Sequence, residues 1–343
     1  MGIRPDSEVP VPPCPPEVFF TRDYGAVWAA AQVRSGAWEP VVRGAYVAAG
    51  TIETPKARAL AEIIAFHQRL DVEHWFSHES AAALWGLALW RDPTTTHLRQ
   101  AGRPAQGKMP VRRHVGAVPR EHQAQVNGLP VTSLELTAVD CARSLPPLDA
   151  LVVADAAWRA GADPARCAAL LDTLQGRNGA RQARDVLALA DPGAESPQET
   201  AIRFHLLAAG LPAPQTQVKV PTWCGTYWSD LGYPQWNILI EYDGRTKYVG
   251  DEWFREKRRL DAIIEANNRI VRTTTEDLYT PSIIVTRVRH LLPPFVHHPP
   301  HPPATTVPGQ FEPLTPIHWF KAVEWRRRLE LGLVQPKSWV KHT

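Results

Sequence analysis

The segment 237–247, NILIEYDGRTK, constrains this chain more than any other, because an apolar run there ends in two carboxylates. In a strand, residues two apart point to the same face of a sheet. One face would carry Ile238, Ile240 and Tyr242, and the other Leu239, Glu241 and Asp243. Burying two like charges on one face is costly unless cations compensate them. A core strand that ends in this way therefore needs positive charge nearby.

A divalent metal ion would supply that charge. Mg²⁺ prefers hard oxygen ligands, commonly one or two carboxylates together with waters and phosphate oxygens. Asp230 precedes the strand, and it would face Glu241 if the two arms of YWSDLGYPQWNILIEYD pair through the turn at 232–235. A metal bound there would activate a water and offset the charge that develops on a phosphate.

The acids have a second interpretation that involves no metal. Glu241 and Asp243 could form a surface cluster at the strand end with nearby cations, namely Arg245, Lys247 or Arg272. An isolated E-x-D would favour that cluster. The presence of Asp230 and Glu199 in the expected order, followed by a basic helix, favours the metal site.

The surrounding elements predict one α/β unit over 192–292. Ser196-Pro197-Gln198-Glu199 is a capping box with proline at the first helical position. Helix, three strands, helix, strand and helix then follow in order. In the second helix, WFREKRRLD, the spacing of Trp253, Leu260 and Ile264 predicts that these three side chains pack inward.

The N-terminal half alternates short helices with a hairpin-like pair of strands. Thr54-Pro55 and Ser77 are helix start signals, and Gly86 is a stop signal. This order fits a winged helix-turn-helix. The predicted fold class is therefore α+β and multidomain. Its parts are a disordered leader at 1–18, a winged-helix region at 19–129, a helical connector at 130–191, the α/β domain at 192–292 with a mixed sheet, and a Pro/His-rich linker with a last helix at 293–343.

Composition excludes several classes of protein. No stretch of 18 or more apolar residues is present, which argues against a membrane span. The N-terminus lacks the apolar segment of a signal peptide, and the four cysteines form no CxxC pair. These features predict a cytoplasmic chain. The formal net charge of +3 does not by itself identify nucleic acid as a partner.

The stretch from Glu199 to Leu292 resembles the PD-(D/E)XK restriction-endonuclease-like superfamily, in the branch related to very-short-patch-repair (Vsr) endonucleases. The resemblance rests on Glu199, Asp230, the strand LIEYDG and the basic helix WFREKRRLD. It implies Asp230 and Glu241 as ligands of Mg²⁺ or Mn²⁺, with Glu199 as a supporting acid. In the nuclease interpretation, Asp243 also supports the metal.

The chain departs from the superfamily pattern at one position. The usual lysine of E-x-K is replaced by Asp243, and relatives that carry a histidine after Asp-Gly are matched here by Lys247. Either Lys247 has taken over the orientation of water and the stabilisation of charge, or the site has lost its activator.

Roughly residues 19–145 are similar to the winged-helix and linker region of AbiEi-type antitoxins. The similarity rests on GAWEPVVRGAYVAAG, SHESAAALWGL and GLPVTSLELTAVDCAR. It implies DNA binding with Arg43 near the backbone, and a toxin-like partner protein. His78 is expected to hydrogen-bond in the first turn of its helix and not to act as a ligand.

Basic side chains next to the acids are the candidate DNA contacts of the C-terminal domain: Arg255, Lys257, Arg258, Arg259, Arg272 and Lys219. They would bind phosphates, with an affinity that weakens with salt. A solvated helix face is the equally weighted alternative for the four on the helix.

Two main functions follow from these observations. One is an Mg²⁺-dependent DNA endonuclease delivered by a winged helix. The other is an antitoxin-like transcriptional regulator on a catalytically inactive nuclease scaffold. A third, a protein adaptor, rests only on WFKAVEWRRR near the C-terminus. The tract HHPPHPP is interpreted as linker and not as a metal site.

Overall fold

The computed structural model describes residues 8–102, 111–244 and 251–293, with the side chains of 251–253 left out. The chain divides into two compact units, Val9–Ala190 and the part from Asp191 onward. Each unit is described by itself. The candidate Lys247, the tract HHPPHPP and the C-terminal helix lie outside the described residues.

The first unit begins with a small antiparallel sheet in the order β1-β3-β2. Its strands are β1 (Phe19–Phe20), β2 (Trp38–Val42) and β3 (Ala45–Ala48). The accompanying helices are α1 (Thr21–Tyr24), α2 (Ala26–Arg34) and α3 (Pro55–His67). The expected start of α3 is confirmed, since the Thr54 hydroxyl accepts a hydrogen bond from the Ala57 amide.

A five-stranded mixed sheet in the order β6-β5-β4-β8-β7 forms the centre of this unit. Its strands are β4 (Trp75–Phe76), β5 (Thr96–Gln100), β6 (Val111–Val115), β7 (Gln123–Val126) and β8 (Leu129–Thr132), with a 3-10 turn η1 at Arg120–His122. The remaining helices are α4 (His78–Leu84), α5 (Leu134–Ser144), α6 (Pro147–Arg159), α7 (Pro164–Thr173) and α8 (Ala180–Ala188).

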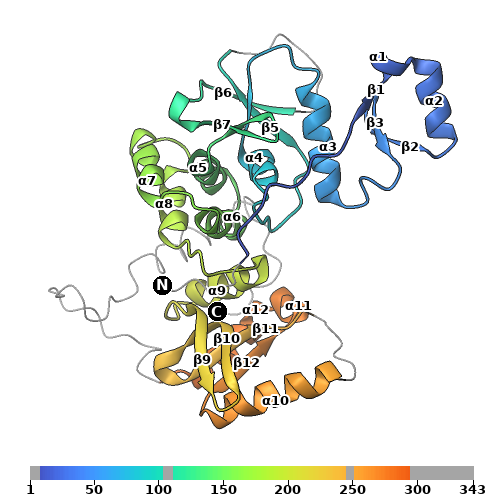
Figure 1. Cartoon of the computed structure of the whole chain (residues 1–343). Helices are drawn as coiled ribbons and strands as arrows, with labels where there is room; N and C mark the ends of the chain where they lie inside the picture. Colours follow the sequence, from blue (N-terminus) through green and yellow to red (C-terminus); the bar gives the residue numbers. More distant parts are fainter. Residues whose placement is uncertain (1–7, 103–110, 245–250, 294–343) are drawn as a thin grey trace. The chain divides into compact units, whose positions relative to one another are not determined.

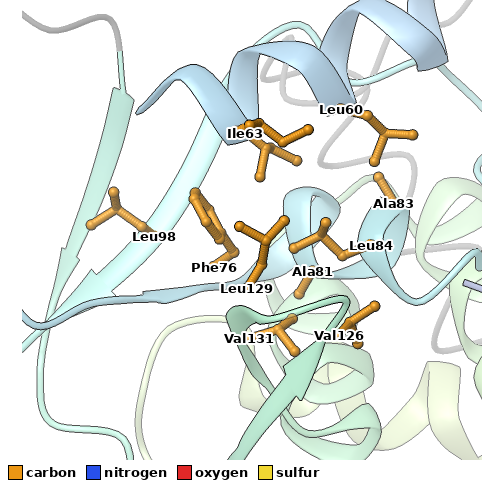
Figure 2. Close-up of a cluster of buried hydrophobic side chains, with 11 residues drawn as sticks. Leu60, Ile63, Phe76, Ala81, Ala83, Leu84, Leu98, Val126, Leu129 and Val131 are labelled. Atoms are coloured by element: carbon orange, nitrogen blue, oxygen red, sulfur yellow. The ribbon is translucent and has the colours of Figure 1, made fainter. Parts of the chain in front are cut away.

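Figure 2 shows the main core of the first unit, where α3 and α4 pack on the five-stranded sheet. Leu60 and Ile63 come from α3, and Leu84 comes from α4. The sheet contributes Phe76 and Leu98, both fully buried. This cluster fixes α4 against β5 and so determines where the side chains at the start of α4 can reach.

One predicted boundary in this half falls inside a strand, and the described part of the predicted leader is packed. The boundary at 129/130 falls inside β8, which pairs with β4 at Phe76↔Val131 and with β7, so the strand joins the predicted winged-helix region to the connector. The described part of the leader, 8–18, has no helix or strand but is packed. The Asn127 side chain donates to the Pro13 carbonyl at 2.8 Å, and Val18 contacts three core clusters.

The second unit is a four-stranded mixed sheet in the order β12-β11-β10-β9, with helices on both faces (Figure 1). Its elements are α9 (Pro197–Ala208), β9 (Gln215–Thr222), β10 (Gly225–Tyr233), η2 (Pro234–Trp236), β11 (Ile238–Tyr242), α10 (Asp251–Glu265), β12 (Arg269–Thr273), α11 (Thr275–Tyr279) and α12 (Pro281–Leu291). The predicted order of helices and strands is confirmed, with α11 as an addition.

The alternation predicted for the central strand β11 is confirmed by its packing. Ile238, Ile240 and Tyr242 join the core formed with α9 and α12. Leu239 faces the other side, where it packs with Ile263 of α10. Both faces of β11 are therefore covered, and the acids that end it lie at the rim of a buried strand.

Taken together, the described residues form an α+β chain with mixed sheets, as the sequence predicts at this level. In the same part of the chain, no helix has both the length and the apolar character needed to cross a membrane.

Candidate functional site

The hairpin formed by β10 and β11 brings Asp230 opposite Glu241. The strands pair antiparallel with Leu231↔Ile240 and Gly232↔Leu239, so the next pair along the register is Asp230 with Glu241. The Tyr242 amide donates a hydrogen bond to Asp230 Oδ2 at 2.8 Å, which holds this carboxylate against the end of β11. The juxtaposition predicted from the turn is confirmed.

Arg259 of α10 lies between two carboxylates. Its guanidinium donates from NH1 and NH2 to the two oxygens of Glu241 at 3.0 and 2.8 Å. It also donates from Nε and NH2 to the two oxygens of Glu256 at 2.8 and 2.9 Å. Both contacts are bidentate, the strong geometry for an arginine–carboxylate pair. Bonding to Glu256 and to Glu241 raises the pKa of Arg259.

Arg272 of β12 balances the other acid at the end of β11. The parallel pairing of β11 with β12 sets Glu241 beside Arg272. The Arg272 guanidinium donates to Asp243 Oδ2, and it lies 3.7 Å from Glu256 Oε1. The Asp243 amide is held by the Thr273 carbonyl at 2.7 Å. The ion pair predicted between these acids and Arg272 is therefore present, but the partner is Asp243 and not Glu241.

These side chains line a pocket of about 130 Å³ at the end of the sheet. Its lining residues are Trp228, Asp230, Glu241, Tyr242, Asp243, Glu256, Arg259 and Arg272. Four carboxylates and two guanidinium groups thus face one small volume. The donor set consists of carboxylate oxygens, the ligand type that Mg²⁺ and Mn²⁺ prefer.

Glu199 caps the first turn of α9, and its carboxylate interacts electrostatically with Asp230. Its amide donates to Ser196 Oγ, while its carboxylate accepts from Ser196 Oγ at 2.8 Å and from the Glu195 amide at 2.9 Å. The predicted helix start is therefore confirmed. Burial, followed by the negative charge of Asp230, raises the pKa of Glu199 to about 8.

The pKa of Asp230 is raised for similar reasons. Burial raises its pKa to about 6, the charges of Glu241 and Glu195 act in the same direction, and the Tyr242 amide opposes them. A carboxylate with a raised pKa is stabilised as an anion when a cation binds beside it. Asp230 lines the pocket, whereas Glu199, the predicted supporting acid, is not among its lining residues.

The basic residues predicted as DNA contacts fall into two groups. Arg259 and Arg272 are bonded to carboxylates inside the pocket, and their predicted contact with phosphate remains a prediction. The others are exposed: Arg255, Lys257 and Arg258 on α10, Lys219 on β9, and Arg43 in the turn between β2 and β3. The Arg258 guanidinium lies 5.1 Å from the centre of the Trp223 ring.

The sequence pattern gave the wrong phase for α10. Ile264 is 57% exposed, whereas Ala262 and Ile263 are fully buried. The buried side therefore runs through Ile263 and Arg259, four residues earlier. Glu256 lines the pocket because it is one turn before Arg259 on the same side of α10.

Comparison with known proteins gives relatives but no activity. No protein-family profile matches the chain. It is 32% identical over 224 residues to the "Uncharacterized protein MT2308" of Mycobacterium tuberculosis (strain CDC 1551 / Oshkosh), an alignment that covers 62% of this chain and 79% of the relative. The same values hold for the "Uncharacterized protein Rv2248" of strain ATCC 25618 / H37Rv.

Among solved structures, the chain is similar to the crystal structure of the RV2827C protein from Mycobacterium tuberculosis. The identity is 19% and the TM-score 0.35, with 50% of this chain and 72% of that chain covered.

Proposed function

We propose that this chain, which belongs to the family of the mycobacterial proteins MT2308 and Rv2248, is a divalent-metal-dependent DNA endonuclease with its carboxylates on β10 and β11. The main observation behind this proposal is the pair Asp230 and Glu241. The two acids lie opposite each other on adjacent strands and line one pocket with two more acids. The resemblance of Glu199–Leu292 to the restriction-endonuclease-like superfamily, and of the N-terminal half to winged-helix antitoxins, supports the same proposal.

In this proposal, Asp230 and Glu241 hold Mg²⁺ or Mn²⁺. Such an ion would offset the charge that develops on the oxygens of a phosphodiester during hydrolysis. Within the part of the chain that the structure describes, Asp230 uses only Oδ2 in a hydrogen bond, so Oδ1 is available as a ligand atom. Both oxygens of Glu241 are already bonded to Arg259, so metal binding at Glu241 competes with that guanidinium.

The remaining residues of the pocket have supporting roles. Glu199 holds a proton at neutral pH because its pKa is about 8, and a cation bound near Asp230 would favour loss of that proton. Asp243, held by Arg272, stands where the superfamily has its lysine. Arg259 can turn from Glu241 to a phosphate, to which a guanidinium binds with the same bidentate geometry.

The test is plasmid nicking in Mg²⁺ and in Mn²⁺ by the full chain and by an Asp230→Asn/Glu241→Gln variant. Glu265→Gln, an exposed acid at the end of α10, is the matched control, purified in the same way. We expect nicking by the wild type and by the control, and its loss in the double variant. Equal nicking by the double variant would overturn the proposal, because a contaminating nuclease would survive the substitutions.

A second function is supported by a specific observation, the occupation of the acids by arginine. Glu241 is bonded by Arg259, Asp243 is bonded by Arg272, and no lysine lines the described pocket. These contacts suit an antitoxin-like regulator in which the nuclease scaffold is structural. Under this alternative, binding to a DNA operator needs no metal. A gel-shift series with and without EDTA, together with the absence of nicking, separates it from the nuclease.

A further inference from the structure

Three histidines of the first unit meet at one point. His78 begins α4, His97 lies on β5 and His114 lies on β6, and one ring nitrogen of each falls within 4.8 Å of the other two. The rings of His78 and His114 stack with centroids 3.8 Å apart. His78 and His97 are buried and His114 is half-buried.

The spacing of the closest nitrogens matches that of ligands on one ion. His114 Nε2 lies 3.2 Å from His97 Nδ1. Two nitrogens bound to one tetrahedral Zn²⁺ at 2.0–2.1 Å stand roughly 3.3 Å apart. The pair is thus already at ligand spacing, and a ring nitrogen of His78 lies within 4.8 Å of both.

His78 is held in an unusual conformation by the groups around it. Its φ is 54°, in the left-handed region that residues other than glycine rarely adopt. Strain of this kind persists where the surrounding structure enforces it, often at functional sites. His78 Nδ1 lies 3.0 Å from Ser77 Oγ and 3.8 Å from a buried Asp140 oxygen. A ligand histidine is commonly oriented by such partners on its second nitrogen, which leaves Nε2 for a metal.

Negative charge accompanies the three imidazoles. Glu79 Oε2 is buried and has no hydrogen-bond partner among the described residues, and it lies 3.6 Å from His97 Nδ1. A buried carboxylate oxygen without a donor is costly unless a cation lies close.

We propose that His78, His97 and His114 form a binding site for Zn²⁺, with the Glu79 carboxylate beside it to offset the charge. Imidazole nitrogens suit Zn²⁺ and related transition ions, whereas Mg²⁺ prefers oxygen. This site is separate from the carboxylate pocket of the other unit and does not depend on the proposed nuclease activity.

The charged groups around the cluster are compatible with this assignment. Arg99 is bonded bidentately to Asp140, and Arg143 donates to the Asn178 carbonyl. Arg112 is exposed. Neutral imidazole is the form that binds metal.

The experiment uses the full chain after removal of metal with a chelator. Zn²⁺ is titrated calorimetrically, and Co²⁺ is added in parallel for its visible spectrum, which reports tetrahedral coordination by histidine. We expect one Zn²⁺ per chain. His97→Ala and His114→Gln should each weaken Zn²⁺ binding by at least about 100-fold, since loss of even an outer partner costs 10–100-fold. Glu79→Gln should cost about 10-fold to 100-fold without loss of stoichiometry.

Three controls isolate the site. His67→Gln removes one member of another histidine pair, His67 Nδ1 with His74 Nε2 at 3.1 Å, and should leave Zn²⁺ binding unchanged. Replacement of His297, His298 and His301 by alanine removes the histidine-rich tract and should also change nothing at this site. Asp230→Asn/Glu241→Gln should keep one Zn²⁺ per chain.

Wild-type protein that binds no Zn²⁺, or binding that survives His114→Gln but is lost with the 297–301 replacement, would overturn the proposal. Since His114 is half-buried, His114→Gln is the variant that should fold most readily, and circular dichroism verifies this. If His97→Ala fails to fold, His114→Gln and the Co²⁺ spectrum of the wild type decide the question.

Discussion

Arg259 binds both oxygens of Glu241 through a two-pronged contact, NH1 to Oε1 at 3.0 Å and NH2 to Oε2 at 2.8 Å. The acid ends a central strand and the cation comes from the helix that covers that strand. The same guanidinium also holds Glu256. Arg259 thus neutralises Glu241, and its removal should expose the charge conflict between the acids of the pocket.

The first prediction concerns Arg259→Ala. We expect the metal-free variant to lose about 1–3 kcal/mol of stability, less than a fully buried pair because Arg259 is partly exposed. Mg²⁺ should then raise the melting temperature of the variant more than that of the wild type, because it replaces the lost cation. Thermal unfolding with and without Mg²⁺ measures both effects. Arg255→Ala, on the exposed side of α10, is the control, and an equal response of both variants to Mg²⁺ would contradict the prediction.

The second prediction concerns two exposed basic residues as DNA contacts, in contrast to the arginines that are bonded to the carboxylates of the pocket. Lys219→Ala and Arg258→Ala should each weaken binding to duplex DNA and lower the slope of log affinity against log salt by about 1, as expected for the loss of one phosphate contact. Fluorescence anisotropy at several salt concentrations gives that slope. Arg269→Ala, a change at the other edge of the sheet, serves as a control, and identical slopes in all variants would remove these residues from the interface.

The third prediction is a pH dependence of stability due to His205 of α9. Burial lowers the pKa of His205 to about 4 in the folded protein, against about 6.5 in the unfolded chain. The unfolded state therefore binds the proton more tightly. The free energy of unfolding is therefore unaffected by His205 above about pH 6.5. It falls by up to about 3 kcal/mol as the pH is lowered toward 4.

His205→Gln should remove this dependence. Denaturant unfolding of the wild type and the variant between about pH 7 and pH 4.5 should give a smaller acid destabilisation for the variant. His290→Gln, an exposed histidine of the same unit, should follow the wild type. Parallel curves for the wild type and His205→Gln would show that His205 does not titrate in this way.

The fourth prediction tests whether the segment before β1 is part of the first unit. A Cβ at Gly86 would lie 2.1 Å from the Val11 carbonyl oxygen, whereas a Cβ at Gly128 would meet nothing within 4 Å. Both glycines have positive φ, 74° and 78°, so alanine costs roughly 1–2 kcal/mol of backbone strain at either position.

Gly86→Ala should therefore be more destabilising than Gly128→Ala, by about 1 kcal/mol or more, because it must also displace the chain at Val11. Limited proteolysis should cut near Val11 faster in Gly86→Ala than in Gly128→Ala. Equal cutting and equal melting temperatures would mean that the segment does not pack on Gly86 in solution.

The carboxylate pair was predictable because its geometry is local. Asp230 and Glu241 belong to one hairpin, and the period of two along each strand decides which side chains share a face. The position of Arg259 was not predictable in the same way. Both Ile263 and Ile264 can continue an apolar stripe, and a shift of one residue turns the helix by about 100° and moves Arg259 from solvent to the pocket.

The histidine cluster shows a different limit. His78 contacts Ser77 at its helix start, as expected, whereas the proposed zinc site departs from the expectation that His78 is not a ligand. Its neighbours His97 and His114 come from two strands that pair in parallel, with Arg99 opposite His114. Their spacing along the sequence does not predict that the three histidines lie close together, because strand pairing and the packing of α4 on β5 bring them there.

The hairpin turn between β10 and β11 has a consequence for how this family can vary. The turn contains Asn237 in the left-handed conformation, with φ 53°. A shift of the β10–β11 pairing by one residue would send Glu241 to the face opposite Asp230. The register that this turn sets is therefore as strict a requirement for the pocket as the acids themselves, and a homologue that keeps both acids but pairs them one residue out of register would lose the site.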